Sequence, residues 1–254
     1  MQKENKTYNQ PPDKPGAKAI FAAAFKDSIP VLMGYSTMGF AAGVLLAVKG
    51  GIAWPVAWGA ATSAAFISGP LQYIFVDWLQ TSLALGSVLL VALCVNFRYS
   101  LYGLSLVERF KDVKLWKKSY LIGTITDETY ALQTACRLSG REYVSYCFFL
   151  AMLNHAYWIL GVTTGACTGI VAQGAFSPEK VQSFTKGIDF AMTALFLVIL
   201  TDQIRDRHNR VPAAIGFGAA LAAFLLFGRL NMLIPSVIAI ISVFFICRRR
   251  LDVQ

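Results

Sequence analysis

Basic residues form short clusters between long apolar runs in this chain, and this arrangement restricts what the chain can fold into. The runs are about as long as the 20 residues of helix that cross a bilayer. They are continuous and rich in alanine, leucine and glycine, without the alternation of a membrane barrel. The sequence therefore predicts an all-α, polytopic integral membrane protein. Its hydrophobic segments, about eight in number, cover residues 27 to 48, 52 to 76, 81 to 107, 119 to 137, 143 to 173, 187 to 201, 211 to 228 and 232 to 247.

Composition supports the same class of protein. Hydrophobic residues make up 56% of the 254 residues and charged residues only 15%, whereas a soluble domain carries about 25% charged residues. The formal net charge of +9 comes from clusters of the kind that orient a membrane protein, so nucleic acid is not an expected partner. The five cysteines have no Cys-x-x-Cys spacing. We expect buried apolar thiols rather than disulfides, a metal site or a bound cofactor.

The chain divides into one membrane domain and two polar ends. Residues 1 to 26 hold three prolines and lack the apolar core of a signal peptide, so we expect a disordered cytoplasmic tail. Residues 27 to 247 form the helical transmembrane domain, and residues 248 to 254 form a basic cytoplasmic C-terminus.

The positions of the basic clusters do not fit eight simple crossings. Clusters of lysine and arginine favour the cytoplasm, but three segments separate the lysines of the N-terminal tail from the cluster that begins at Arg109. Three more separate Lys118 from Arg205. One segment of each set must therefore enter the membrane and return on the same side.

Two segments are the best candidates for this re-entrant course. Segment 52 to 76 is broken by Ser68-Gly69-Pro70, and segment 119 to 137 carries Asp127 and Glu128. Interrupted helices at membrane depth are tolerated only where they line a cavity or are covered by protein, and they recur at transporter binding sites. The charge pattern thus points to these interruptions as the functional region.

Asn96 and Arg98 lie in the middle of the apolar run 89 to 106. An arginine at mid-depth costs about 2.5 to 3.5 kcal/mol on insertion scales, so we expect it to face protein, a cavity or an anionic substrate. Its guanidinium can pair in a bidentate manner with the carboxylate of a substrate or of an internal acid such as Asp127 or Asp189. The alternative is that Arg98 snorkels at the interface and that Asn96 bonds a neighbouring helix.

Five motifs are distinctive: Ser63-Ala64-Ala65-Phe66-Ile67-Ser68-Gly69-Pro70-Leu71-Gln72-Tyr73, Asn96-Phe97-Arg98-Tyr99-Ser100-Leu101-Tyr102-Gly103, Thr126-Asp127-Glu128-Thr129-Tyr130-Ala131-Leu132, Trp158-x-x-Gly161-x-x-x-Gly165 and Gly187-Ile188-Asp189-Phe190-Ala191. In their order and approximate spacing, these motifs make the chain similar to the AzlC family. The resemblance covers about residues 26 to 247. It implies the large subunit of a branched-chain amino acid exporter, a secondary transporter that works with a small membrane subunit of the AzlD type and moves valine, leucine, isoleucine or analogues.

An amino acid substrate gives the helix break a role. Ser68, Gly69 and Gln72 offer backbone groups and an amide to the polar atoms of a zwitterion, beside Asn96 and Arg98. The alternative is a plain proline kink with close helix packing.

Three residues are candidates for coupling transport to a proton. Asp189 follows Gly187, so it is either a first-turn acid stabilised by the helix dipole or a protonatable carboxylate. Asp127 is either a protonatable group or a helix cap, and Glu128 points about 100° away from it on a helix. His155 belongs to the residue type that titrates near neutral pH, although a histidine within a membrane commonly makes a packing hydrogen bond.

Glycines at about four-residue spacing predict close helix packing rather than chemistry. They form two sets: Gly34, Gly39 and Gly43, then Gly161, Gly165 and Gly169.

Together these features favour a proton-coupled carrier subunit that exports branched-chain or related neutral amino acids across the bacterial inner membrane, with both termini in the cytoplasm. A membrane channel or a sensor is the alternative. An intramembrane enzyme is disfavoured, because the sequence has neither a His-Glu-x-x-His nor a Gly-x-Ser-x-Gly motif.

Overall fold

The computed structural model describes most of the chain as helix, in two compact units whose boundary in the sequence lies between Thr185 and Lys186. The residues that it describes are 16–81, 85–181, 183, 185–187, 197, 201, 204–205, 210–232, 235–236, 238–240 and 242–243. No strand occurs among these residues, which confirms the predicted all-α class.

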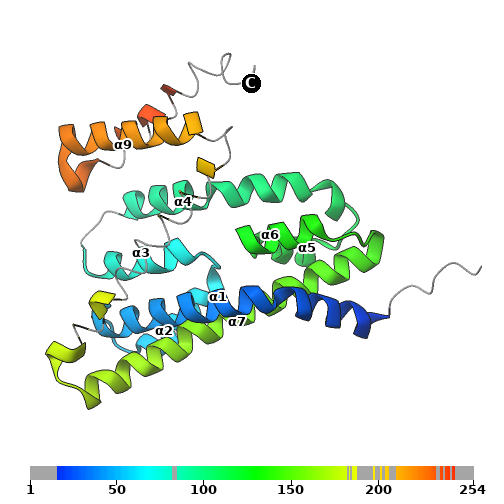
Figure 1. Cartoon of the computed structure of the whole chain (residues 1–254), viewed down its shortest axis with the longest axis horizontal. Helices are drawn as coiled ribbons and strands as arrows, with labels where there is room; N and C mark the ends of the chain where they lie inside the picture. Colours follow the sequence, from blue (N-terminus) through cyan, green and yellow to red (C-terminus); the bar gives the residue numbers. More distant parts are fainter. Residues whose placement is uncertain are drawn as a thin grey trace, which may run out of the picture. The chain divides into compact units, whose positions relative to one another are not determined.

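The first unit contains three long helices and two pairs of short helices that build the candidate site (Figure 1). They are α1 (Ala17–Lys49), α2 (Pro55–Ala65), α3 (Gly69–Leu79), α4 (Leu85–Leu106), the 3-10 turn η1 (Glu108–Phe110), α5 (Leu115–Gly123), α6 (Asp127–Ala135) and α7 (Gly140–Ala175). In the second unit, α9 (Arg210–Asn231) is interrupted at Gly228, where φ is 73°.

Four of the described helices are long and apolar enough to cross a membrane: α1, α4, α7 and α9. The predicted number of about eight segments is not confirmed by the described residues. The first helix also begins earlier than its apolar run, at Ala17 rather than near residue 27.

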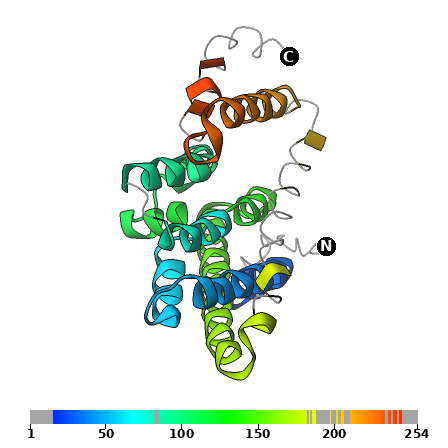
Figure 2. The same cartoon turned by 90° about the vertical axis from the view of Figure 1, so that its left-hand side faces the viewer.

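A seam of glycines joins α1 and α7, which run parallel and side by side (Figure 1, Figure 2). A methyl group added to Gly43 would overlap the backbone of Val162, and one added to Gly165 would overlap the backbone of Phe40. The predicted close packing is therefore confirmed for these glycines. Gly34 is an exception, because nothing in the described structure lies within 4 Å of its open face.

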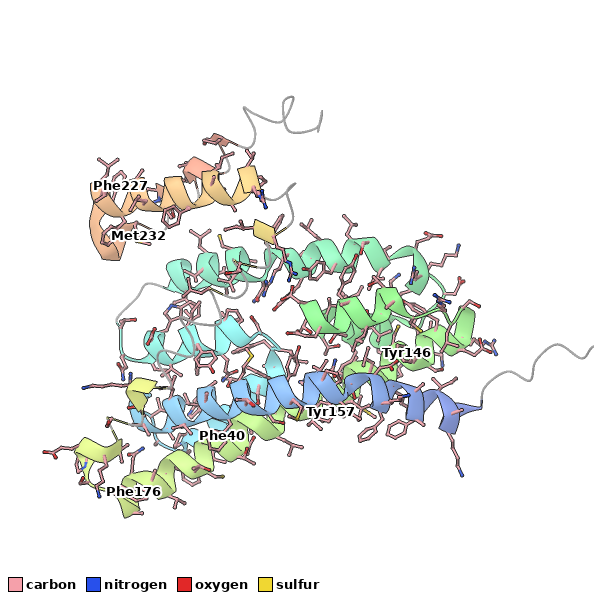
Figure 3. The ribbon with its side chains drawn as sticks, in the orientation of Figure 1. Phe40, Tyr146, Tyr157, Phe176, Phe227 and Met232 are labelled. Atoms are coloured by element: carbon pink, nitrogen blue, oxygen red, sulfur yellow. The ribbon has the colours of Figure 1, made fainter. Side chains whose placement is uncertain are left out.

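Side-chain hydrogen bonds also join α1 and α7 along this row of glycines. Figure 3 labels Tyr146 and Tyr157 on α7 and Phe40 on α1. Tyr146 donates a hydrogen bond to Asp27 at 2.8 Å, and the Tyr157 hydroxyl lies 3.1 Å from the hydroxyl of Ser28. The seam thus combines backbone contact with hydrogen bonds between helices, as membrane helices do.

Segment 55 to 79 is a helical hairpin rather than a crossing. Helix α2 ends at Ala65, Phe66 and Ser68 are extended, and α3 begins at Gly69. Each helix has 11 residues, or about 16 Å, which is half of what a bilayer core requires.

The two helices of this hairpin lie antiparallel. Gln72 Nε2 donates to Thr62 Oγ1 across the hairpin at 2.9 Å. Beyond the end of α3, the Gln80 amide donates to the carbonyl of Lys49, the last residue of α1. The chain therefore returns to the end from which it entered, as the charge pattern predicts.

A second hairpin, α5–α6, enters from the opposite end of the unit (Figure 1). Its helices have nine residues each, so neither can span. Arg109 lies before the hairpin and Tyr143 lies after it, and the arginine donates to the tyrosine hydroxyl at 3.3 Å. This segment too returns to its starting end.

The two ends of the first unit differ in charge. The end that holds Arg109 and the start of α7 carries most of the basic residues, and we call it the basic end. Its described lysines and arginines are Lys18, Lys26, Arg109, Lys111, Lys114, Lys117, Lys118, Arg137 and Arg141. The opposite end, where α1 and α3 finish, has Lys49 and Lys180.

Candidate functional site

The tips of the two hairpins reach α4 two residues apart, at mid-depth. Ser68 Oγ donates to Asn96 Oδ1 at 2.7 Å, and Arg98 Nη2 lies 2.9 Å from Asp127 Oδ2. Arg98 is 10 residues from Val88 and 8 from Leu106, the limits of the apolar part of α4, or about 15 and 12 Å. We call Ser68, Asn96, Arg98, Thr126 and Asp127 the tip junction.

Hydroxyl caps fix both hairpin tips. Ser68 Oγ accepts from the backbone N–H of Leu71 at 3.4 Å, and Thr126 Oγ1 accepts from that of Thr129 at 3.2 Å. Each cap begins the second helix of its hairpin, so the N-termini of α3 and α6 both face the middle of the unit. The positive ends of two helix dipoles are therefore directed at this region.

Arg98 pairs with an internal acid, which is one of the arrangements that the sequence allows. Its Nη2 also donates to the Tyr99 hydroxyl at 3.3 Å, and its Nε is buried without a partner among the described residues. The side chains of Arg98 and Asp127 are 28% and 38% exposed. The Tyr102 hydroxyl donates to the other carboxylate oxygen of Asp127 at 2.8 Å. The guanidinium is therefore held by protein groups in this structure.

Asp127 and Glu128 face different helices, as their adjacency on a helix predicts. Asp127 faces α4, whereas Glu128 Oε2 lies 3.0 Å from the Tyr35 hydroxyl of α1. The same hydroxyl lies 2.6 Å from Thr126 Oγ1. The cap of α6 is Thr126, so Asp127 is a first-turn acid and not the cap itself.

His155 connects both hairpins to α7. Its Nε2 lies 3.2 Å from the carbonyl oxygen of Ser63 in α2, and its Nδ1 lies 3.2 Å from the Tyr120 hydroxyl in α5. Because a carbonyl only accepts, Nε2 is the donor in the first contact, and in a neutral ring Nδ1 then accepts from the tyrosine. These contacts agree with the packing role that the sequence left open for His155.

Several buried polar atoms near the two tips have no partner among the described residues: Gln72 Oε1, Trp158 Nε1 and Asn154 Oδ1. The Asn154 amide nitrogen donates to Thr129 of α6 at 2.9 Å. Trp158 lies beside Gly69, since a Cβ there would be 3.8 Å from its ring. The face of α7 next to the α3 N-terminus thus offers an unused donor and, one turn away, an unused acceptor. Such atoms cost free energy unless water or a ligand satisfies them.

The structure therefore brings four of the predicted binding residues to one region and separates others. Ser68, Asn96 and Arg98 belong to the tip junction with Asp127, and Gly69 starts α3 next to it. Gln72 is fully buried one turn further along, against Thr62. Asp189 lies outside the described residues.

Tyr35 is a site residue that the sequence did not single out, and Tyr102 and Thr126 stood within motifs without a role of their own. A threonine directly before two acids is a helix-start signal, so Thr126 was identifiable. Tyr35 and Tyr102 gave no such signal, because their roles depend on which helices become neighbours.

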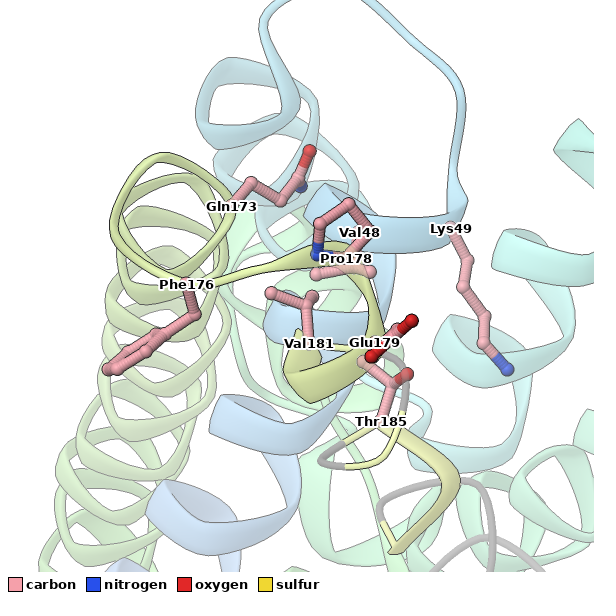
Figure 4. A pocket seen from close by; sticks show the side chains of 8 residues that line it. All are labelled: Val48, Lys49, Gln173, Phe176, Pro178, Glu179, Val181 and Thr185. Carbon is pink, nitrogen blue, oxygen red and sulfur yellow. The ribbon is translucent and has the colours of Figure 1, made fainter.

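A surface pocket occupies the far end of α1 and α7, away from the tip junction (Figure 4). Lys49, on its rim, follows Tyr35 by 14 residues of α1, or about 21 Å. None of the predicted site residues that the structure describes lines it. The lining residues are Val48, Lys49, Gln173, Phe176, Pro178, Glu179, Val181 and Thr185.

Two re-entrant hairpins that meet at mid-depth beside charged groups define a polytopic helical membrane protein of the kind found among secondary transporters. The chain belongs to the AzlC family, whose model, described as AzlC protein, matches residues 30–171. It is 32% identical over 237 residues to an uncharacterized membrane protein of Helicobacter pylori, a match that covers 91% of this chain and 98% of the relative.

Two further relatives carry more informative names. The chain is 29% identical over 236 residues to the branched-chain amino acid transport protein AzlC of Bacillus subtilis, covering 92% of this chain and 87% of that protein. It is 27% identical over 221 residues to the inner membrane protein YgaZ of Escherichia coli, covering 85% and 86%. No solved structure matches the chain.

Proposed function

We propose that this chain is the large subunit of a secondary transporter that exports branched-chain or related neutral amino acids across the bacterial inner membrane. The observation that carries the proposal is the Arg98–Asp127 pair, at 2.9 Å, where two re-entrant tips meet in the middle of the unit. A charged pair at this depth marks a solute path in membrane proteins. The name of the Bacillus subtilis relative supports branched-chain amino acids as the solute.

The substrate site in this proposal is the tip junction and its surroundings. Arg98 binds the substrate carboxylate, since its planar fork matches a carboxylate and its Nε has no partner among the described residues. Ser68, Gly69, Gln72 and Asn96 supply backbone and amide groups from the α3 tip and α4. The helix N-termini at Ser68 and Thr126 favour the same anionic group.

Orientation follows from the charge difference between the ends of the first unit. The basic end faces the cytoplasm, because short loops rich in lysine and arginine are retained there. The N-terminal tail, which precedes α1 at that end, and the basic C-terminus are both cytoplasmic.

A small AzlD-type membrane subunit completes the transporter in this proposal. Support comes from glycines whose open faces have nothing within 4 Å in the described structure: Gly34 on α1 and Gly216 and Gly218 on α9. Small residues of this kind form interfaces between membrane helices. Expressed alone, the chain should give little export, and full activity of the purified single chain in proteoliposomes would contradict the partner.

Proton coupling is assigned to Asp189. A carboxylate removed from water takes up a proton more readily, whereas an arginine keeps its charge. Asp189→Asn should therefore leave leucine binding measurable and abolish the response of transport to a pH gradient. Normal gradient-driven transport by this variant would refute the assignment and leave Asp127 as the next coupling candidate.

The proposed function is tested with inside-out vesicles that contain the chain and the small subunit. Radiolabelled leucine uptake should saturate with leucine concentration, increase when the vesicle interior is acidic, and disappear with Arg98→Lys. Vesicles with the small subunit alone are the control. Uptake equal to this control would contradict a transporter, and unsaturable uptake that ignores the gradient would indicate a channel.

A further inference from the structure

The two charged groups of the tip junction match the two charges of a free amino acid. Arg98 is a cation on α4, and Asp127 is an anion on the tip of α5–α6. They face each other at 2.9 Å. A zwitterion carries an anion and a cation one carbon atom apart, so it presents the complementary charge to each residue.

We propose that the substrate inserts between Arg98 and Asp127, with its carboxylate on Arg98 and its ammonium on Asp127, and so replaces the direct ion pair. The inference rests on the proposed function and deepens it, because it assigns Asp127 to recognition of the ammonium group. The site would then require both charges of the amino acid.

The surroundings of Asp127 favour this role. Its Oδ1 accepts from Tyr102 at 2.8 Å, which fixes the carboxylate, and its Oδ2 is the atom bound to Arg98. When a substrate carboxylate takes the guanidinium, Oδ2 becomes available to a cation. Exposure of 38% leaves the Asp127 side chain accessible.

Neighbouring acceptors are less suited to the ammonium group. Glu128 faces α1 and is bonded to Tyr35. Asn96 Oδ1 is uncharged and already accepts from Ser68 at 2.7 Å. Within the part of the chain that the structure describes, Asp127 is therefore the anion that faces Arg98.

Replacement of the ion pair also has a mechanical consequence. In the observed state the pair fastens the α5–α6 tip directly to α4, and the stacked rings of Tyr102 and Tyr130, with centroids 4.3 Å apart, make a second attachment. A substrate between the charges moves Arg98 and Asp127 apart and leaves the Tyr102–Tyr130 stack in place. Occupancy of the site is thereby communicated to one hairpin and not to the other.

Three ligands that differ only in charge test the inference on the purified two-subunit complex. They are leucine, 4-methylpentanoate, which lacks the ammonium group, and 3-methylbutan-1-amine, which lacks the carboxylate. Binding is measured by competition with radiolabelled leucine at equilibrium. The wild-type complex should bind leucine at least about tenfold more tightly than either analogue, because each loses a charge-assisted contact.

In Asp127→Asn, leucine loses its ammonium contact and 4-methylpentanoate loses nothing, so the ratio of their affinities should fall by about tenfold or more. The amine loses the same contact as leucine, so the affinity ratio of leucine to 3-methylbutan-1-amine should stay nearly unchanged. In Arg98→Gln, the affinity ratio of leucine to 3-methylbutan-1-amine should fall, and the ratio of leucine to 4-methylpentanoate should stay nearly unchanged. Glu128→Gln is the matched control and should change neither ratio. Asp127→Glu, which keeps the charge, should retain the preference for leucine even if overall affinity falls.

The outcomes separate this inference from the proposed function. Leucine binding with an unchanged ratio in Asp127→Asn would overturn the ammonium assignment and leave a purely structural ion pair. If the wild-type complex bound 4-methylpentanoate as tightly as leucine, that result alone would overturn the ammonium assignment. Failure of the wild-type complex to bind leucine would contradict the proposed function itself.

Discussion

The two re-entrant hairpins share one construction and differ in the chemistry of their tips. Both begin their second helix with a hydroxyl cap, at Ser68 and Thr126, and both contact the middle of α4. The α2–α3 tip is buried and uncharged, whereas the α5–α6 tip carries a partly exposed Asp127 paired with Arg98. The difference indicates that the first tip supplies shape and backbone dipoles, and the second supplies the charge that responds to a ligand.

The largest effect should come from Arg98, on which the charged tip depends. Arg98→Lys removes the planar fork, and transport should fall about 100-fold, because a point charge does not reproduce a bidentate contact. The measurement is leucine uptake in inside-out vesicles. Arg109→Lys, an equivalent change at the exposed basic end, is the control. Equal loss in the two variants would mean that Arg98 has no special role.

Removal of the Ser68 cap should lower the stability of the protein more than removal of the Thr126 cap. Ser68→Ala loses the cap and leaves Asn96 Oδ1 without its donor, so we expect a loss of about 2 kcal/mol of stability. Thr126→Ala loses its cap, but Tyr35 keeps Glu128 as an acceptor, so about 1 kcal/mol is expected.

Thermal unfolding of the purified complex measures the difference between the caps. Ser68→Thr, which keeps the hydroxyl, is the matched control for the first tip. A larger loss from Thr126→Ala than from Ser68→Ala would reverse the comparison of the tips.

The smallest effect is a difference in the reactivity of introduced thiols. Gln72 is fully buried behind the first tip, whereas Glu128 is exposed at the second. In a background without native cysteines, Glu128→Cys should react with a membrane-impermeant maleimide faster than Gln72→Cys. Faster labelling of Gln72→Cys would place the accessible cavity on the other hairpin.

The fold was largely predictable from charge and hydropathy. Clusters such as the one at Arg109 must stay on one side, and this requirement identified both re-entrant segments before any contact was known. A break at Ser68-Gly69-Pro70 followed from local chemistry, because proline at the start of a helix needs no N–H partner. The start of α1 at Ala17 was missed, since residues 17 to 26 lack an apolar run.

The site was only partly predictable, because pairs between elements depend on packing. The sequence left open whether Arg98 pairs with a substrate carboxylate, pairs with an internal acid or snorkels, and it did not choose between Asp127 and Asp189 as the acid. That choice depends on the depth at which the α5–α6 tip stops, and the nine-residue length of α6 and the cap at Thr126 set this depth. The partnership of Tyr35 with Glu128 depends on α1 and α6 becoming neighbours, which no local pattern encodes.

The most direct test of the account is an experimental structure of the two-subunit complex with leucine bound. The account predicts both hairpins re-entrant from opposite ends and leucine at the tip junction, with its carboxylate within hydrogen-bond distance of Arg98. Leucine bound in the pocket near Lys49, or residues 55 to 79 crossing the membrane as one continuous helix, would contradict it.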